Sequence, residues 1–276
     1  MKNIIRLTNY KLFVFDINGT LLGDSGRLTA YTRNVLMRLK ETGLGYTLAT
    51  GKNLPGMKPL ADELEIDLPM VLANGSILED RHGNFFKKHV LPREKVVQTV
   101  ALAEQHNKDL VMYIDDSIYL KTLTENVLQV YNDVSEGLIE ASDWDAVRDQ
   151  FGAVNKCLVV DAYDRQNLFD MEIIFREAFH GVVDLLHASP MLLEVMPKGI
   201  SKVTGIERIA SQLGAAMNEV MAFGNYDNDV EMLQAAGLGA AVADASPAAA
   251  ASADLIIRAC AQDGPARFLD ELMQSR

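Results

Sequence analysis

Short apolar runs that alternate with amphipathic segments constrain the fold of this chain more than any other feature of its sequence. The first run, Lys11-Leu-Phe-Val-Phe15, lacks polar alternation, which is typical of a strand buried on both faces of a parallel sheet. A helix is predicted over 28–42, a strand over 46–49, a helix over 55–65 and a strand over 69–73. This order predicts a doubly wound, Rossmann-like α/β fold.

The alternation breaks after residue 75 and returns only in the last third of the chain. Residues 76–90 predict a hairpin that turns at His82-Gly83-Asn84, and the segments after it mix helices and strands without strict alternation. The first pattern returns near Leu192-Leu-Glu-Val195, with helices over 201–213, 229–236 and 264–273 and strands over 219–223 and 238–242. We therefore predict a discontinuous core domain, residues 1–82 and 190–276, with an inserted α+β cap domain, residues 83–189.

The composition excludes several classes of protein. Hydrophobic residues make up 49% of the 276 residues and charged residues 23%, which is the balance of a globular chain and not of a disordered one. The formal net charge is −12 and no lysine or arginine cluster offers a basic face, so we expect no nucleic-acid partner. Because no apolar run has the length of a membrane helix, we expect no membrane partner either.

Two further features favour a cytoplasmic location. The two cysteines, Cys157 and Cys260, lack metal-ligand spacing, and Cys157 lies in an apolar run, as a buried thiol does. This suggests a reducing compartment. The first ten residues are interrupted by polar side chains and lack the apolar stretch of a signal peptide. The oligomeric state is not readable from the sequence.

Polar residues follow several of the predicted core strands. Asp16, Thr50, Asn74 and Asn225 each come directly after, or within two residues of, a predicted strand. Ligands of open α/β sheets bind outside the carboxyl ends of the strands. We therefore expect these four side chains to lie along one edge of the sheet and to form the functional site.

Four short motifs carry a resemblance to a known family. They are, in chain order, Phe15-Asp-Ile-Asn-Gly-Thr-Leu-Leu22, Leu48-Ala-Thr-Gly51, Pro197-Lys-Gly-Ile-Ser-Lys202 and Gly224-Asn-Tyr-Asp-Asn-Asp229. This series resembles the four motifs of the haloacid dehalogenase (HAD) superfamily, and the resemblance covers nearly the whole chain. The insert between the second and third motifs resembles the type IIB cap of Cof-like sugar-phosphate phosphatases.

The resemblance implies a phosphatase that acts on a small phosphorylated metabolite, most naturally a sugar phosphate. Asp16 would be the nucleophile and would form an aspartyl-phosphate that water then hydrolyses. Lys202 would supply fixed positive charge to the phosphoryl oxygens. The remaining phosphate contacts would come from Thr50, Gly51, Asn74 and Asn228.

The resemblance also implies a bound Mg²⁺, which suits an oxygen-lined site. Its ligands would be Asp16, the backbone carbonyl of Asn18, Asn225 and Asp229, the last of these acting through bound waters. Taken singly, Thr50 is also compatible with a turn, Lys202 with a solvated helix lysine, and Asp229 with an acid in the first turn of a helix.

Two positions depart from the family pattern. Asn18 stands where a second aspartate usually acts as general acid and base, a role that an amide cannot fill. Asn225 stands where an aspartate often binds the metal, although an amide oxygen can also do so. Asn18 has three explanations: an engineered change that traps a ligand, a natural change for which another acid such as Asp227 compensates, or a loss of fast turnover.

Other functions and other site residues remain open at this point. The chain could be a HAD-fold protein that binds or senses a phosphorylated metabolite with little turnover, or a phosphotransferase that passes the phosphoryl group to a sugar. A dehydrogenase is not favoured, because no Gly-x-Gly-x-x-Gly follows the first strand. Within the cap, Asp115-Asp116 is interpreted as a turn and His187 as a packed or hinge residue, while Glu194 lies near the return to the core.

Overall fold

An inner strand of the first sheet, β1 (Leu12–Phe15), is buried on both faces, as its apolar run predicts. The computed structural model describes residues 5–131, 138–141 and 143–274. In it, β1 pairs in parallel with β2 (Gly45–Leu48) and with β12 (Val220–Gly224). Two more parallel strands, β13 (Leu238–Val242) and β14 (Leu255–Ile257), complete the order β14-β13-β12-β1-β2.

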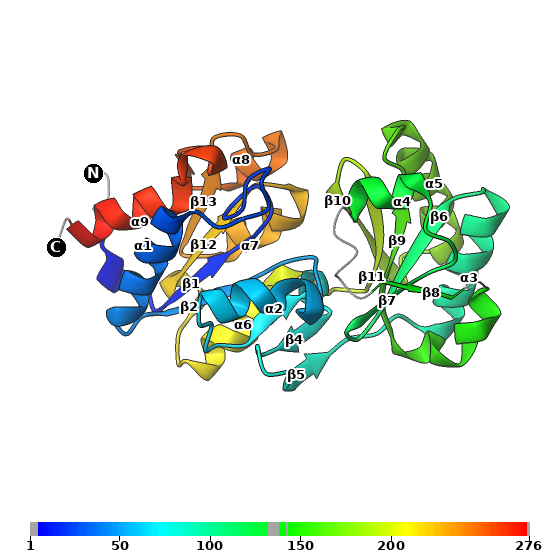
Figure 1. Cartoon of the computed structure of the whole chain (residues 1–276), viewed down its shortest axis with the longest axis horizontal. Coiled ribbons are helices and arrows are strands. Elements are labelled where there is room, and N and C mark those ends of the chain that lie inside the picture. The colour runs from blue at the N-terminus through cyan, green and yellow to red at the C-terminus, as the bar shows by residue number, and fades with distance from the viewer. Residues whose placement is uncertain (1–4, 132–137, 142, 275–276) are drawn as a thin grey trace.

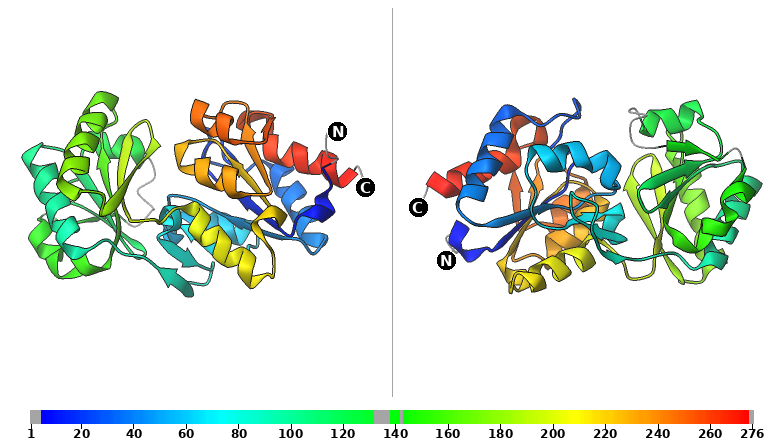
Figure 2. Two further views of the ribbon diagram at one scale, coloured as in Figure 1. Left: turned by 180° about the vertical axis from the view of Figure 1, so that it is seen from behind. Right: turned by 60° about the horizontal axis from the view of Figure 1, so that its bottom comes forward.

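Helices cover both faces of this sheet (Figures 1 and 2). Because successive strand residues face opposite sides, Phe13 and Phe15 pack with α1 (Ala30–Glu41), α2 (Leu54–Glu63) and α9 (Gly264–Gln274), and Leu12 and Val14 pack with α6 (Lys202–Gln212) and α7 (Val230–Ala235). A short helix, α8 (Pro247–Ser252), follows β13 and contacts α7. The prediction of a doubly wound α/β core is confirmed.

A three-stranded antiparallel sheet extends this core. β3 (Met70–Leu72) continues from β2 through a parallel bridge between Ala49 and Val71, and it pairs with β4 (Ile77–Glu79), which pairs with β5 (Phe85–Lys88). The carboxyl ends of β1, β2, β3 and β12 therefore lie at one edge. Asp16, Thr50, Asn74 and Asn225, which were predicted to lie along this edge, follow these four strands.

A second sheet forms a separate unit beside the first (Figure 1), with the order β10-β11-β9-β6-β7-β8. Its strands are antiparallel except for the β7–β8 pair. Helices α3 and α5 and the 3₁₀ segment η4 pack on one face, and α4 packs on the other. The bounds are α3 Arg93–Gln105, β6 Asp109–Ile114, β7 Ser117–Leu120, α4 Glu125–Val130, β8 Leu138–Glu140, η4 Trp144–Ala153, β9 Val154–Val160, α5 Arg165–Phe179, β10 Val183–Ser189 and β11 Leu192–Pro197.

Strand pairing corrects one expectation about the chain's return to the core. Residues 192–195 were expected to resume the first sheet, but β11 pairs with β9 and β10 in the second sheet. The predicted boundaries at 82/83 and 189/190 also fall inside the paired hairpins β4–β5 and β10–β11. The division into a core domain and a cap domain remains a proposal, and these pairings favour boundaries outside both hairpins.

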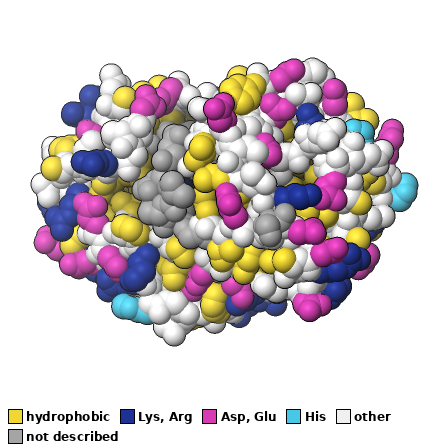
Figure 3. Space-filling model, turned by 45° about the vertical axis from the view of Figure 1, so that its right-hand side comes forward, with side chains coloured by type: hydrophobic (Ala, Val, Ile, Leu, Met, Phe, Trp, Pro, Cys, Tyr) yellow, Lys and Arg dark blue, Asp and Glu magenta, His cyan; other side chains and the backbone are white. Residues whose placement is uncertain are grey.

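Among the described elements named above, β14, α4, β8 and η4 were not predicted. Residues 1–4 of the N-terminal stretch, and residues 132–137 and 142 of a stretch whose sequence was ambiguous, lie outside the described residues. No helix among the described residues is long and apolar enough to cross a membrane. On the face shown in Figure 3, acidic and basic side chains are interspersed, and the described lysines and arginines do not gather into a stripe.

Candidate active site

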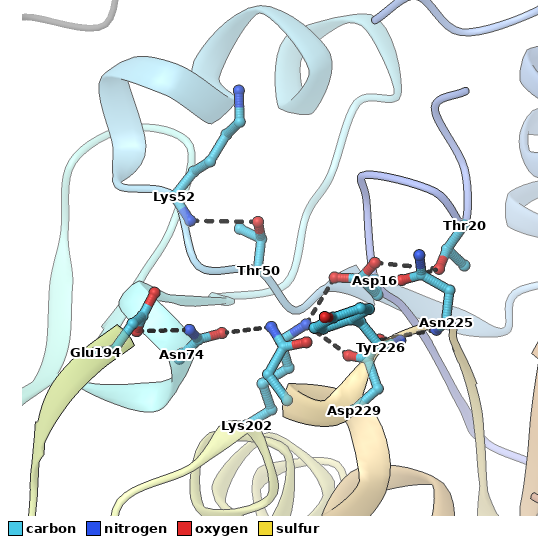
Figure 4. A network of polar contacts seen from close by, with 11 residues as sticks. Asp16, Thr20, Thr50, Lys52, Asn74, Glu194, Lys202, Asn225, Tyr226 and Asp229 are labelled. Carbon is cyan, nitrogen blue, oxygen red and sulfur yellow. Dashed lines mark hydrogen bonds and ion pairs between the residues drawn. The ribbon is translucent and has the colours of Figure 1, made fainter. Parts of the chain in front are cut away.

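Asp16 lies at the carboxyl end of β1, where the backbone leaves the sheet. Its N–H donates a 2.9 Å hydrogen bond to the carbonyl of Phe223, so the parallel pairing with β12 fixes the Asp16 backbone. The residue is only 6% exposed and sits among loops that follow four different strands (Figure 4). A carboxylate held there is rigid and almost dry.

Lys202 joins Asp16 to Asp229. Its Nζ donates to Asp16 Oδ1 and to Asp229 Oδ1, each at 2.6 Å, and all three side chains are buried. Lys202 is the first residue of α6, and Gly75 lets the loop after β3 pack against that helix start. A Cβ on Gly75 would lie 2.1 Å from the carbonyl oxygen of Ser201, and its φ of +101° also favours glycine.

The electrostatics of this cluster follow from its burial. Burial, and then the negative charge of Asp229, raises the pKa of Asp16 to about 6, although Lys202 opposes the rise. Burial alone would lower the pKa of Lys202, but the charges of Asp16 and Asp229 outweigh it and raise the pKa. The cluster therefore places one ammonium between two carboxyl groups.

Both oxygens of Asp229 are engaged. Oδ1 accepts from Lys202, and Oδ2 accepts from the backbone N–H groups of Asn225 and Tyr226 at 2.8 and 3.1 Å. Asp229 thus fixes the loop after β12 and orients Lys202. This geometry suits a carboxylate that reaches a metal through water better than one that binds it directly.

Asp16 and Asn225 each place a side-chain oxygen beside the hydroxyl of Thr20. Thr20 Oγ1 lies 3.1 Å from Asp16 Oδ2 and 3.3 Å from Asn225 Oδ1, so a carboxylate and an amide oxygen flank the same hydroxyl (Figure 4). Mg²⁺ prefers oxygen ligands and keeps several of its waters. The donors at this edge fit Mg²⁺, although the described residues contain no group of three or more His, Cys, Asp or Glu side chains placed to hold a metal.

The predicted phosphate-binding residues also meet at this edge. The Asn74 N–H donates to the carbonyl of Thr50 at 2.9 Å, and the Asn228 amide donates to Asn74 Oδ1 at 3.1 Å. A Cβ on Gly51 would lie 3.2 Å from the Asn74 amide nitrogen, so the glycine keeps the two loops close. Asn74 adopts φ +54°, a left-handed conformation that asparagine tolerates better than most residues.

Comparisons with known proteins identify the family. A family model for haloacid dehalogenase-like hydrolases matches residues 13–269. The chain belongs to this family. An HMP-PP phosphatase of Yersinia pseudotuberculosis is 27% identical over 268 residues, which cover 96% of each protein. A solved haloacid dehalogenase-like hydrolase from Bacteroides thetaiotaomicron is 27% identical, with a TM-score of 0.84, over 95% of this chain and 99% of that one.

The HAD fold is supported independently by a further solved structure. A sugar phosphatase of HAD subclass IIB superimposes with a TM-score of 0.81 over 95% of this chain and 98% of its own, at 22% identity. At that identity the likeness concerns the fold alone. The predicted superfamily and the predicted architecture, a HAD core with an inserted type IIB cap, are confirmed.

Other residues singled out from the sequence take no part in the hydrogen bonds given above for Asp16, Lys202 and Asp229. Asn18 is exposed, and its backbone forms a bridge with Leu22. Asp227 accepts a 2.6 Å hydrogen bond from the Ser246 hydroxyl. His187 packs on Phe169 and contacts Glu172 within the second unit, and Asp115-Asp116 forms the turn between β6 and β7, as interpreted.

Sequence reasoning assigned no role to two residues that the structure ties to the site. Thr20 was part of the first motif, but its hydroxyl contact to Asp16 depends on how the loop folds. Lys156 precedes Cys157 in an apolar run, and the structure shows that it is buried and pairs with Glu194, which contacts Asn74. A lone charge in each of two apolar runs, Lys156 and Glu194, was the available signal.

Proposed function

We propose that this HAD-family hydrolase is a Mg²⁺-dependent phosphatase that releases phosphate from a small phosphorylated metabolite through an aspartyl-phosphate on Asp16. The carrying observation is the buried Asp16 carboxylate, which lies 2.6 Å from Lys202 at the carboxyl edge of the sheet. A fixed cation beside a dry carboxylate is what attack on an anionic ester requires. Its curated relatives carry the name HMP-PP phosphatase.

The reaction proceeds in two displacements. In the first, an Asp16 carboxylate oxygen forms a bond to phosphorus while the bond from phosphorus to the ester oxygen breaks, and the leaving alkoxide takes up a proton. In the second, water attacks the phosphorus of the acyl phosphate, inorganic phosphate leaves with a proton lost to solvent, and the Asp16 carboxylate is restored. Lys202 neutralises charge on the phosphoryl oxygens in both steps.

The amides and backbone groups orient the phosphate. Thr50, Asn74 and Asn228 form one hydrogen-bonded group, and they would donate to the phosphoryl oxygens. Figure 4 shows Thr50 and Asn74 near Lys202. Mg²⁺ bound by oxygens of Asp16, Asn18 and Asn225 would neutralise the ester and fix its geometry. Asp229 would hold that cation through water and would keep the Asn225 loop in place.

The substrate class is proposed from the cap and from the relatives. The second unit contacts the core beside the phosphate site, because Glu194 of β11 accepts a hydrogen bond from Asn74. A unit placed there excludes water and selects the leaving group. We favour a sugar phosphate, the substrate class named for the subclass IIB relative, and HMP-PP is the second candidate.

The deciding experiment measures phosphate release from a panel of sugar phosphates, HMP-PP and p-nitrophenyl phosphate, with and without Mg²⁺. Asp16→Ala serves as the blank. Release that requires Mg²⁺ and vanishes in the blank would support the proposal and would rank the substrates. Wild-type release equal to that of the blank, in protein shown to be folded, would refute it.

Asn18 favours a second candidate function. Without the usual aspartate, the site has no assigned proton donor for the leaving group, and Asp227 is already engaged by Ser246. A protein of this kind would bind a phosphorylated metabolite and turn it over slowly. Tight binding of a panel member by calorimetry, with no release above the blank, would favour this sensor function over the phosphatase.

A further inference from the structure

A buried ion pair of the second unit reaches the phosphate site. Lys156 Nζ on β9 lies 2.7 Å from Glu194 Oε1 on the neighbouring strand β11, and the two side chains are 1% and 2% exposed. Taking two charges out of water costs several kcal/mol for each ion, and a hydrophobic pair of similar volume is often as stable. Stability alone therefore gives little reason for charges at these two positions.

The second oxygen of Glu194 provides a reason. Glu194 Oε2 accepts a 2.9 Å hydrogen bond from Asn74 Nδ2 (Figure 4). Asn74 Oδ1 accepts a 3.1 Å hydrogen bond from Asn228 Nδ2. An ionised carboxylate only accepts hydrogen bonds, whereas an amide has one accepting and one donating end. Glu194 therefore dictates which end of Asn74 faces it, and Asn74 in turn dictates the orientation of Asn228.

Lys156 holds the other oxygen of Glu194. Its ammonium donates to Oε1 at 2.7 Å, which leaves Oε2 for the Asn74 amide. The Lys156 ammonium also lies over the ring of Tyr113, 4.5 Å from its centroid, and this contact helps to fix its position. Each side chain in the series Lys156, Glu194, Asn74 and Asn228 is thus oriented by the hydrogen bond to the one before it.

We propose that Glu194 and Lys156 are positioning residues of the second unit, which orient the Asn74 and Asn228 amides for the phosphoryl group. The Asn74 backbone is held by Thr50 of the core, while its side chain is held by the second unit. Phosphate binding is thereby coupled to the docking of the two units. The kinetic part of this inference rests on the proposed phosphatase function, and its spectroscopic part does not.

Glu194→Gln is the first test. The glutamine has one accepting end, so if that end meets Lys156, its donating end faces Asn74, and both asparagine amides must turn over. We expect kcat/KM to fall by about tenfold to a hundredfold, the cost of a small misplacement at a reacting centre. Glu104→Gln is the matched control, because Glu104 pairs with Lys121 on the surface of the same unit, and it should leave kcat/KM unchanged.

A second substitution separates positioning from a merely structural role. In Glu194→Gln with Asn74→Asp, the new carboxylate accepts from both Gln and Asn228, so Asn228 regains its original orientation. Asn74→Asp alone sets two carboxylates against each other. We expect the double variant to exceed Asn74→Asp in kcat/KM by at least about tenfold, whereas a purely structural pair predicts additive losses. Additive losses would overturn the proposal.

The NMR signals of the side-chain amides test the positioning role without a measurement of catalysis. In isotope-labelled protein free of substrate, the Asn228 amide signals should move in Glu194→Gln, stay in place in Glu104→Gln, and return to their wild-type positions in the double variant. Unchanged Asn228 signals in Glu194→Gln would overturn the positioning role. If the wild-type protein releases no phosphate, the proposed function fails, and these spectra still test the inference.

Discussion

Lys202 Nζ lies 2.6 Å from Asp16 Oδ1, although 186 residues separate the two along the chain. The same nitrogen lies 2.6 Å from Asp229 Oδ1, and none of the three side chains has more than a small exposed fraction. One ammonium thus keeps two buried carboxylates from repelling each other. The reactivity of Asp16 and the stability of this edge of the sheet depend on the same contact.

Lys202→Met should therefore damage stability and catalysis together. Removing one partner of a buried ion pair costs about 3–5 kcal/mol, and removing a preorganised charge beside the reacting group costs about 10²–10³ in kcat. Thermal unfolding and phosphate release would measure the two effects. Lys198→Met, which removes an exposed lysine four residues earlier, is the control and should change neither by much. Similar effects of both substitutions would contradict the assigned role of Lys202.

Gly19→Ala should weaken the binding of Mg²⁺. Gly19 has φ +78°, and a Cβ there would lie 2.2 Å from Asn225 Nδ2, so the amide that we assign to the metal would have to move. We would measure the unfolding temperature against Mg²⁺ concentration. The concentration that gives half of the maximal rise should increase by about tenfold, which corresponds to a loss of about 1.4 kcal/mol in binding free energy. Gly26→Ala is the matched control, because Gly26 has φ +63° and nothing lies within 4 Å of its Cβ position. An equal change in both variants would point to backbone strain alone.

Local patterns were enough to predict the edge of the sheet that carries the site. The runs that became β1, β2, β3 and β12 are apolar and end in polar residues, and parallel strands bring such ends together. The roles of Lys202 and Asp229, by contrast, came from resemblance to HAD motifs. No local rule says that a lysine at the start of α6 reaches the end of β1.

The failures concern pairing between distant segments. Leu192-Leu-Glu-Val195 has the same apolar pattern whichever sheet it joins, so its place beside β9 could not be predicted. β14 was not predicted, because it has only three residues and Ile256 is half exposed, so its sequence lacks the apolar run of a buried strand. Lys156 and Glu194 are each a lone charge in an apolar run, but only the register of β9 and β11 brings them together.

Asn18→Asp should raise turnover if the missing acid limits the reaction. General acid–base catalysis is worth about 10²–10⁴ in rate. Asn18 is an exposed residue two positions after Asp16, so a carboxylate there would stay hydrated. The gain should be larger for sugar phosphates than for p-nitrophenyl phosphate, whose leaving group needs little protonation. Single-turnover rates of both substrates would test this. No gain with either would mean that Asn18 does not limit turnover.

Glu79→Gln should change how stability depends on pH. Glu79 is fully buried in β4, and burial, followed by the charge of Asp116, raises its pKa to about 8, above the ordinary value of 4.5. Between these values the folded protein keeps a proton that the unfolded chain has lost, so stability falls as pH rises, by up to about 1.4 kcal/mol for each pH unit. Urea unfolding at pH 5, 7 and 9 should show this fall in the wild type and in the exposed control Glu104→Gln. Glu79→Gln should show a clearly smaller fall, above all between pH 7 and 9, where the raised pKa of Asp16 no longer contributes. An unchanged slope in that variant would show that Glu79 does not carry the effect.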